Sequence, residues 1–118
     1  MSSVKSTAML LLAMCVVLAS PSLATDVLTP KLLVGSWRSD YGPTYYFRPD
    51  GTWECRAADM TDGGRWKLRR DRQLELDYVG EHNKIYKREI VAIDRVVHET
   101  LYVRTAEARE VWLKQPTS

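Results

Sequence analysis

The sequence predicts an all-β domain, an antiparallel up-and-down meander of about eight short strands that closes into a small barrel after a short N-terminal helical turn. Three observations predict it. Apolar and polar residues alternate with period two from Trp37 onward. Turn signals rich in Gly, Pro, Asp and Asn recur between these segments. The connections are also shorter than the dozen or more residues that a parallel crossover needs.

A short helical turn opens the domain. Thr29 is a suitable N-cap, and Pro30 occupies the first helical position, where its missing N–H costs nothing. Gly35 ends the turn after Val34. Residues 25–34 are therefore a linker with a helical turn, and residues 35–115 form the barrel domain.

The strands follow in order along the chain. Tyr45 and Phe47 share one face of their strand, and Thr52–Arg56 alternates cleanly after the tight turn Pro49–Gly51. These two strands form the clearest hairpin, and a loop is expected over Ala57–Gly63. The predicted strands cover residues 36–39, 44–48, 52–56, 65–68, 73–79, 85–93, 97–104 and 109–114.

Alternation also assigns an inward face to each strand. A bulge would let Ile90 and Ile93 both point inward, and Asp94-Arg95 is predicted to be a turn. In the last strand Trp112 is expected to face outward or to cover an end of the barrel. The residues expected to point inward are Tyr45, Phe47, Trp53, Cys55, Trp66, Leu68, Leu74, Leu76, Tyr78, Leu101, Val103, Val111 and Leu113.

Residues 1–24 have the pattern of a cleavable secretory signal. Lys5 precedes an apolar run over residues 8–19, Pro21 interrupts the run, and small residues stand at Ser22 and Ala24. The run is shorter than the roughly 20 residues of a transmembrane helix, so a membrane anchor is the weaker interpretation. Cleavage after Ala24 predicts a secreted or periplasmic domain with no membrane span.

Charge and cysteine content limit the classes of function. The chain has 17 Lys and Arg residues and 15 Asp and Glu residues, and this near balance argues against a nucleic-acid partner. The basic segment Arg65–Arg72 is interpreted as a solvated turn, with an anionic partner as the alternative. Cys55 would be the only cysteine after cleavage, which excludes an intramolecular disulfide.

Three motifs resemble those of a known family. Leu32–Trp37 resembles the opening of lipocalin-like (calycin-type) domains, with a helical turn followed by Gly-x-Trp. Phe47–Trp53 is similar to the F-x-x-D-G-T hairpin of small secreted bacterial members. Gly64–Leu68 and Leu74–Leu76 resemble their G-x-W and L-x-L pair. The resemblance covers Leu32–Lys114, nearly all of the domain that would remain after cleavage.

The resemblance implies a barrel closed at one end by Trp37, which packs under an arginine of the last strand, matched here by Arg109. It also implies binding of a small hydrophobic or amphipathic ligand inside. The chain is shorter than a full lipocalin and lacks the terminal helix of that family, so an interior filled by side chains is the alternative. The candidate ligand-binding residues are Tyr45, Trp53, Trp66 and Tyr78.

The residue pattern suggests neither a catalytic nor a metal or cofactor site. His82 and His98 are the only histidines, and neither has a chelating partner in sequence. The strand carboxylates Glu54, Glu75 and Asp77 alternate outward. We therefore expect a non-enzymatic ligand-binding domain. The alternatives are an envelope interaction or inhibitor module, using the outer face around Trp112 and the turn at Arg69-Arg70, and an enzyme with its site at the barrel mouth.

Overall fold

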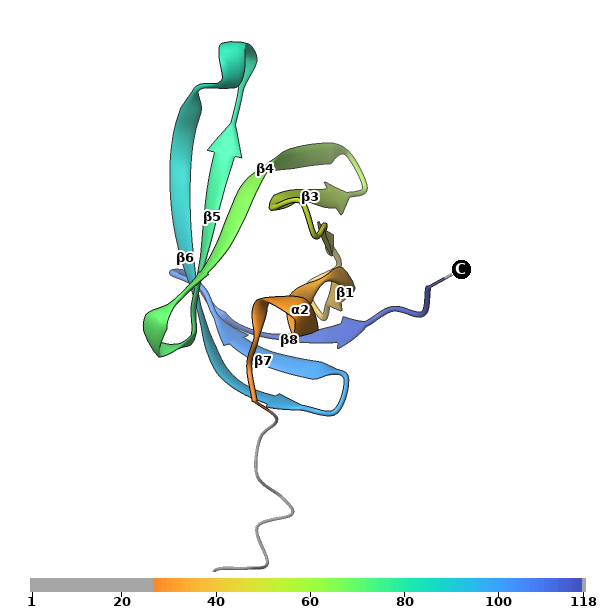
Figure 1. Ribbon diagram of the computed structural model, residues 1–118. Coiled ribbons are helices and arrows are strands. Elements are labelled where there is room, and N and C mark those ends of the chain that lie inside the picture. Colours follow the sequence, from red (N-terminus) through yellow and green to blue (C-terminus); the bar gives the residue numbers. More distant parts are fainter. Residues whose placement is uncertain (1–26, 118) are drawn as a thin grey trace, which may run out of the picture.

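The computed structural model describes residues 27–117 and shows a closed barrel of eight strands (Figure 1). Each strand pairs antiparallel with the next, and β8 closes the barrel against β1, which confirms the predicted fold class. The elements are α2 Pro30–Leu33, β1 Gly35–Ser39, β2 Thr44–Phe47, β3 Thr52–Ala57, β4 Met60–Arg69, η2 Arg70–Arg72, β5 Gln73–Val79, η3 Glu81–Asn83, β6 Ile85–Val97, β7 Thr100–Arg104 and β8 Arg109–Lys114. The predicted secretory signal lies outside the described residues, and within 27–117 no helix is long and apolar enough to cross a bilayer.

Helix α2 covers one end of the barrel, which we call the closed end (Figure 1). The Thr29 side chain caps the helix by accepting a hydrogen bond from the Leu32 amide, and Pro30 stands at its first turn, as predicted. Leu33 is fully buried, and its carbonyl accepts a hydrogen bond of 2.9 Å from the Trp37 indole. Trp37 is therefore anchored across the closed end.

The cation over the Trp37 ring is Lys114, not the expected Arg109. The Lys114 ammonium lies 5.3 Å from the Trp37 ring centroid and donates a hydrogen bond of 3.1 Å to the Val34 carbonyl. Trp37 and Lys114 are direct partners in the β1–β8 register. Arg109 begins β8 at the other end of the strand, where it pairs with Arg104 and is exposed. Strand direction therefore prevents Arg109 from reaching the closed end.

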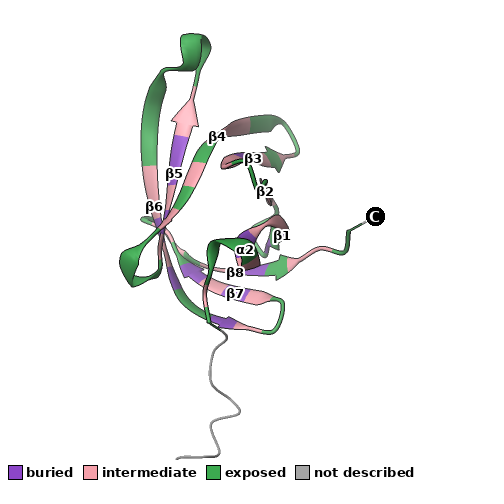
Figure 2. Cartoon of the chain, in the orientation of Figure 1, coloured by how far each residue is buried: buried purple, intermediate pink, exposed green. Residues whose placement is uncertain are grey.

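The core fills the closed half of the barrel interior. Alternate residues point inward as predicted in most strands, and buried segments of the strands are interspersed with more exposed ones (Figure 2). Most of the charged residues are exposed. The buried hydrophobic residues are Leu33, Trp37, Phe47, Trp53, Leu74, Leu76, Val91, Ile93, Val96, Leu101, Val103 and Trp112.

The face assigned to the last strand was wrong. Trp112 is fully buried inside the barrel, whereas Leu113 is 52% exposed on the outside and Val111 is half-buried. Trp112 stands opposite Ser39 of β1 and Leu101 of β7, and both of these residues are buried. With Trp112 inside, period two places its neighbours Val111 and Leu113 on the outer face.

The expected loop over Ala57–Gly63 is replaced by a tight β3–β4 hairpin, because β4 already begins at Met60. Gly63 and Gly64 lie within β4 and do not form a turn; their lack of a side chain allows close contact with the neighbouring strands. A Cβ added at Gly63 would lie 2.8 Å from the Trp53 carbonyl oxygen, and one at Gly64 would overlap the Asp77 carbonyl. Glycine at these positions lets β4 bend closely against both neighbouring strands.

Strand β6 continues through the predicted turn at Asp94-Arg95. A bulge between Ile93 and Arg95 changes the register there, so Val91, Ile93 and Val96 all point inward while Ile90 is only half-buried. The reversal occurs at His98-Glu99, and β7 starts at Thr100 instead of Val97. The prediction that a bulge turns both Ile90 and Ile93 inward was therefore wrong, because the bulge lies after Ile93 and Ile90 stays opposite the outward Glu75.

Candidate functional site

The two ends of the barrel interior differ in accessibility. Loops 40–43, 58–59, 80–84 and 105–108 surround the end opposite α2, which we call the open end. Most of the buried inward hydrophobic side chains are 0–2% exposed, whereas several inward side chains at the open end are only half-buried. The exceptions are Ser39 and Val103, which are buried near the open end, and Trp66 and Leu68, which are half-buried nearer the closed end. Solvent therefore reaches the interior from the open end. The half-buried residues there are Tyr45, Cys55, Asp62, Tyr78, Glu89 and Glu110.

Four aromatic side chains form a continuous row between the core and the open end, and we call this row the aromatic arc. Trp112 stacks on Tyr45 with ring centroids 4.3 Å apart, and Tyr45 lies 6.4 Å from Trp53. Trp53 in turn meets Tyr78 nearly at right angles, with centroids 4.9 Å apart. The arc thus draws on strands β8, β2, β3 and β5.

The arc unites three of the four predicted ligand residues. Tyr45, Trp53 and Tyr78 belong to it, and Trp53 is fixed by a 3.1 Å hydrogen bond from its indole to the Asp77 carbonyl. Trp66 lies apart from the arc, packed edge-on against Phe47, with its indole bonded to the Arg48 carbonyl. Trp112 takes the fourth position, which the wrong face assignment of β8 concealed.

Two carboxylates stand at the two ends of the aromatic arc. Glu110 accepts hydrogen bonds from the Ser39 hydroxyl at 2.6 Å and from the Trp112 indole at 3.0 Å. Glu89 accepts a hydrogen bond of 2.8 Å from the Tyr78 hydroxyl. Sequence reasoning missed both. The wrong face of β8 turned Glu110 outward, and the ambiguous parity of β6 left Glu89 unassigned.

Burial and these carboxylates shift the acid–base chemistry of the open end. Burial, with smaller contributions from Cys55, Glu110 and Glu89, raises the pKa of the Tyr45 hydroxyl well above its ordinary value. Burial and the hydrogen bond to Glu89 do the same to the pKa of Tyr78. Burial also raises the pKa of the Cys55 thiol to about 11. At neutral pH the two phenols and the thiol are therefore neutral.

The remaining chemical candidates lie elsewhere on the molecule. His82 and His98 occupy turns with exposed side chains. Among residues 27–117, no group of three or more His, Cys, Asp or Glu side chains has a metal-binding arrangement. The strand carboxylates Glu75 and Asp77 face outward and pair with arginines, and the closest contact is 2.6 Å between Asp77 and Arg88.

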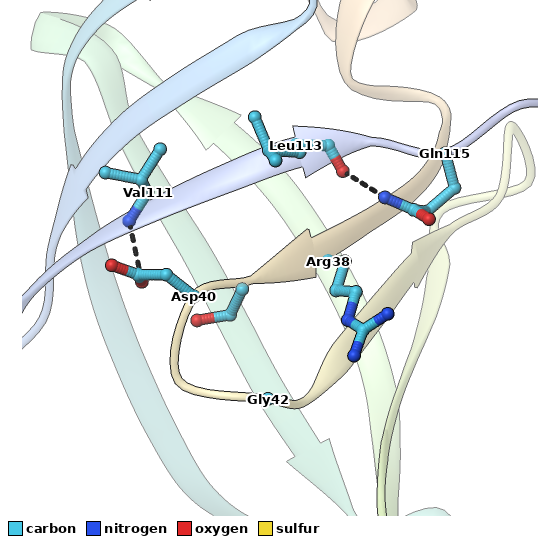
Figure 3. Close-up of a pocket in the computed structure, with 7 residues that line it drawn as sticks. Arg38, Asp40, Gly42, Val111, Leu113 and Gln115 are labelled. Atoms are coloured by element: carbon cyan, nitrogen blue, oxygen red, sulfur yellow. Dashed lines mark hydrogen bonds between the residues drawn. The ribbon is translucent and has the colours of Figure 1, made fainter.

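The outer surface carries a shallow pocket over β1 and β8 (Figure 3). It has a volume of about 480 Å³, and Leu113 lies at one side with Arg38 near it. Asp40 accepts a hydrogen bond of 3.0 Å from the Val111 amide across this pocket (Figure 3). The alternative function predicted from the sequence, an interaction module, used the outer face around Trp112. Because Trp112 is buried, Leu113 is the apolar side chain available there.

The positive charge of the basic segment Arg65–Arg72 is partly neutralised by a carboxylate on the same face. Arg69 lies 3.7 Å from Glu75, and Glu75 also lies 3.9 Å from Arg88. Arg70 and Arg72 are exposed in the turn η2. These contacts favour the interpretation of a solvated, mixed-charge surface over an uncompensated basic patch.

Comparison with known proteins adds no family assignment. The chain matches no protein-family model, and no curated protein or solved structure is significantly similar to it. The eight-stranded antiparallel barrel with its helical turn is compatible with a calycin-like fold. The function is therefore argued from the geometry of the site.

Proposed function

We propose that the protein is an exported, non-enzymatic binding module that holds a small amphipathic molecule at the open end of its barrel. The supporting observation is the change in exposure along one continuous interior. The arc residue Trp112 is fully buried, while Tyr45 and Tyr78 are half-buried and accessible from the open end. Aromatic walls with a few polar groups at their rim are typical of small-molecule sites.

The chemistry of the open end favours an amphipathic ligand over a purely apolar one. The rings of Tyr45 and Tyr78 offer apolar faces, while Glu89, Glu110 and the Cys55 thiol offer polar groups at the same end. An apolar ligand would cover the two carboxylates and remove their hydration without replacing it, which costs free energy. A ligand with a polar head and an apolar body avoids this cost.

The same groups favour binding over catalysis. The pKa of the Cys55 thiol is raised to about 11, so the thiol is a poor nucleophile at neutral pH. The hydroxyl of Tyr78 is engaged as a donor to Glu89, and its pKa is raised as well. Groups held in their neutral forms suit hydrogen bonding to a ligand.

A blocking substitution tests the proposed location. Binding of the neutral fluorescent probe N-phenylnaphthylamine to the purified protein is measured for the natural chain and for Cys55→Phe, which places a ring in the open end. We expect Cys55→Phe to weaken binding by at least about tenfold. Arg56→Phe places the same ring on the outside of β3 and is expected to bind normally. A folded Cys55→Phe variant with unchanged affinity would contradict the proposal.

A second function is favoured by one specific observation, the exposed Leu113 beside the 480 Å³ outer pocket. On this proposal the barrel is an interaction or inhibitor module of the cell envelope that docks through the outer face of β1 and β8. Leu113→Ser would then abolish capture of the partner in pull-down from the native envelope fraction and leave probe binding unchanged. Cys55→Phe would have the opposite pattern.

Export is supported by the sequence of residues 1–24 alone. Mass spectrometry of the protein isolated from its own cells tests it. We expect the N-terminus to be Thr25. A chain that retains residues 1–24 in the cytoplasmic fraction would contradict export and leave the binding proposal standing.

A further inference from the structure

The two carboxylates at the open end have no cationic partner among the described residues. The ion pairs of residues 27–117 use Glu54, Glu75, Asp77 and Asp94 as their acids, which leaves out Glu89 and Glu110. Their hydrogen-bond donors are neutral groups, namely the hydroxyls of Ser39 and Tyr78 and the indole of Trp112. Both carboxylates are therefore held in a half-buried interior by hydrogen bonds from neutral groups and not by ion pairs.

The aromatic arc lies between these two charges. Trp112 donates to Glu110 at one end of the arc, and Tyr78 donates to Glu89 at the other. Electron-rich ring faces attract cations, and the attraction grows where water is excluded. The charges and the rings thus favour the same kind of ligand group.

The protein itself shows that a ring of the arc accepts a cation. The ammonium group of Lys87 lies 4.7 Å from the centroid of the Tyr78 ring. Lys87 is exposed at the start of β6, on a long and flexible side chain. It is a rim residue that a bound ligand can displace, and no ion pair between Lys87 and Glu89 occurs in the part of the chain that the structure describes.

Glu89 and Glu110 both act electrostatically on the same residue of the arc, Tyr45. Glu110 and Glu89 each contribute to raising the pKa of the Tyr45 hydroxyl, after the larger effect of burial. Tyr45 stacks on Trp112 and stands near the middle of the arc. A positive group bound over Tyr45 would therefore interact with both carboxylates.

We infer that the ligand is an organic cation, a primary amine or related ammonium compound with an aromatic or apolar body, whose charge lies between Glu89 and Glu110 over the aromatic arc. This inference rests on the proposed function and specifies the ligand class for the same site. A metal ion is a poorer fit, because residues 27–117 bring no three metal-ligating side chains together.

Three probes of nearly equal size and different charge test the inference. Phenethylamine is a cation at neutral pH, phenethyl alcohol is neutral and phenylpropionate is an anion. Binding to the purified protein is followed by intrinsic fluorescence of the four tryptophans, which include Trp53 and Trp112 of the arc, and is confirmed by calorimetry. We expect phenethylamine to bind at least about tenfold more tightly than phenethyl alcohol, and phenylpropionate to bind most weakly.

Isosteric substitutions then assign the preference to the two carboxylates. Glu110→Gln and Glu89→Gln keep the acceptor oxygens that Trp112 and Tyr78 use, and each is expected to reduce the amine preference by roughly tenfold without changing alcohol binding. Lys87→Gln removes the competing ammonium and is expected to strengthen amine binding severalfold. Glu99→Gln, an exposed turn residue at the closed end, is the matched control and should change nothing.

The outcomes separate this inference from the proposed function. Equal affinity for the amine and the alcohol, or tighter binding of phenylpropionate, overturns the inference and leaves open-end binding intact. An amine preference that persists in both Gln variants also overturns it, because the charge would then be recognised elsewhere. Absence of binding for all three probes, together with an N-phenylnaphthylamine affinity that Cys55→Phe leaves unchanged, overturns the proposed function as well.

Discussion

The Trp112 indole lies stacked on the Tyr45 phenol inside the barrel, with ring centroids 4.3 Å apart and ring planes inclined by 19°. The contact joins β8 to β2 across the intervening strand β1, so it connects two strands that share no backbone hydrogen bonds. One partner is fully buried and the other is half-buried. The stack is therefore at once the edge of the core and the inner limit of the open end.

Removing this stack should destabilise the fold strongly. Trp112→Ala deletes a fully buried indole, and we expect the free energy of unfolding to fall by about 3–5 kcal/mol. Leu113→Ala, on the exposed neighbour, should change it by no more than about 0.5 kcal/mol. Urea denaturation followed by circular dichroism measures both. Similar losses in the two variants would contradict the inward position of Trp112.

The wrong face assigned to β8 shows where the alternation of apolar and polar residues cannot decide which side chains point inward. Val111, Trp112 and Leu113 are consecutive apolar residues, so alternation predicts two equally good faces. The choice depends on volume inside the closed barrel, because the interior between Ser39 and Leu101 accommodates an indole. That information comes from strands far away in sequence. Period two succeeded in β3 and β5, where polar residues separate the apolar ones.

The same limit explains which site residues were predictable. Trp53 and Tyr78 lie on strands with clear alternation, and the structure brings them together with Tyr45 as one arc. Tyr45 stands in a run of three aromatic residues, and its inward position was predicted from its shared parity with Phe47. Glu89 and Glu110 were missed because their inward position depends on the face chosen for β6 and β8. A signal for Glu110 existed in the sequence. It stands two residues before Trp112, so turning that tryptophan inward also turns the glutamate inward.

The closed end offers a test of the cation over Trp37. Lys114→Met keeps the length of the side chain and removes the ammonium that contacts the Trp37 ring and the Val34 carbonyl. We expect a loss of roughly 1–2 kcal/mol in the free energy of unfolding, from one cation–π contact and one hydrogen bond. Arg109→Met is the control at the exposed end of β8. If Arg109→Met has a lower melting temperature than Lys114→Met, then Arg109, and not Lys114, would be the cation that stabilises the closed end.

The close approach of β4 to β5 makes Gly64 intolerant of a side chain. A Cβ at this position would overlap the backbone carbonyl of Asp77, which cannot move without breaking the β4–β5 ladder. We expect Gly64→Ala to cost at least roughly 3 kcal/mol, the upper range for overpacking. Gly42→Ala meets open space but retains a positive φ of 112°, which is strained for alanine, so it should cost about 1–3 kcal/mol and less than Gly64→Ala. Equal melting temperatures for the two variants would refute the close strand contact.

The outward ion pair of Asp77 and Arg88 should make stability depend on acid pH. The hydrogen bond and charge of Arg88, 2.6 Å from the carboxylate, hold the pKa of Asp77 below its ordinary value of 3.8. A carboxyl whose pKa is lower in the folded state adds stability above pH 3.8, and this contribution disappears as pH falls through the folded-state pKa. Asp77→Asn should therefore be less stable than the natural chain at pH 7 and converge with it in strong acid.

Urea denaturation at several pH values between neutrality and strong acid measures this convergence. Asp59→Asn, in the exposed β3–β4 turn, is the matched control, because it removes the same charge away from any ion pair of residues 27–117. A stability difference between Asp77→Asn and the natural chain that stays constant down to strong acid would show that the Arg88 contact does not lower the pKa of Asp77. The contribution of the side chain would then come from packing against β6.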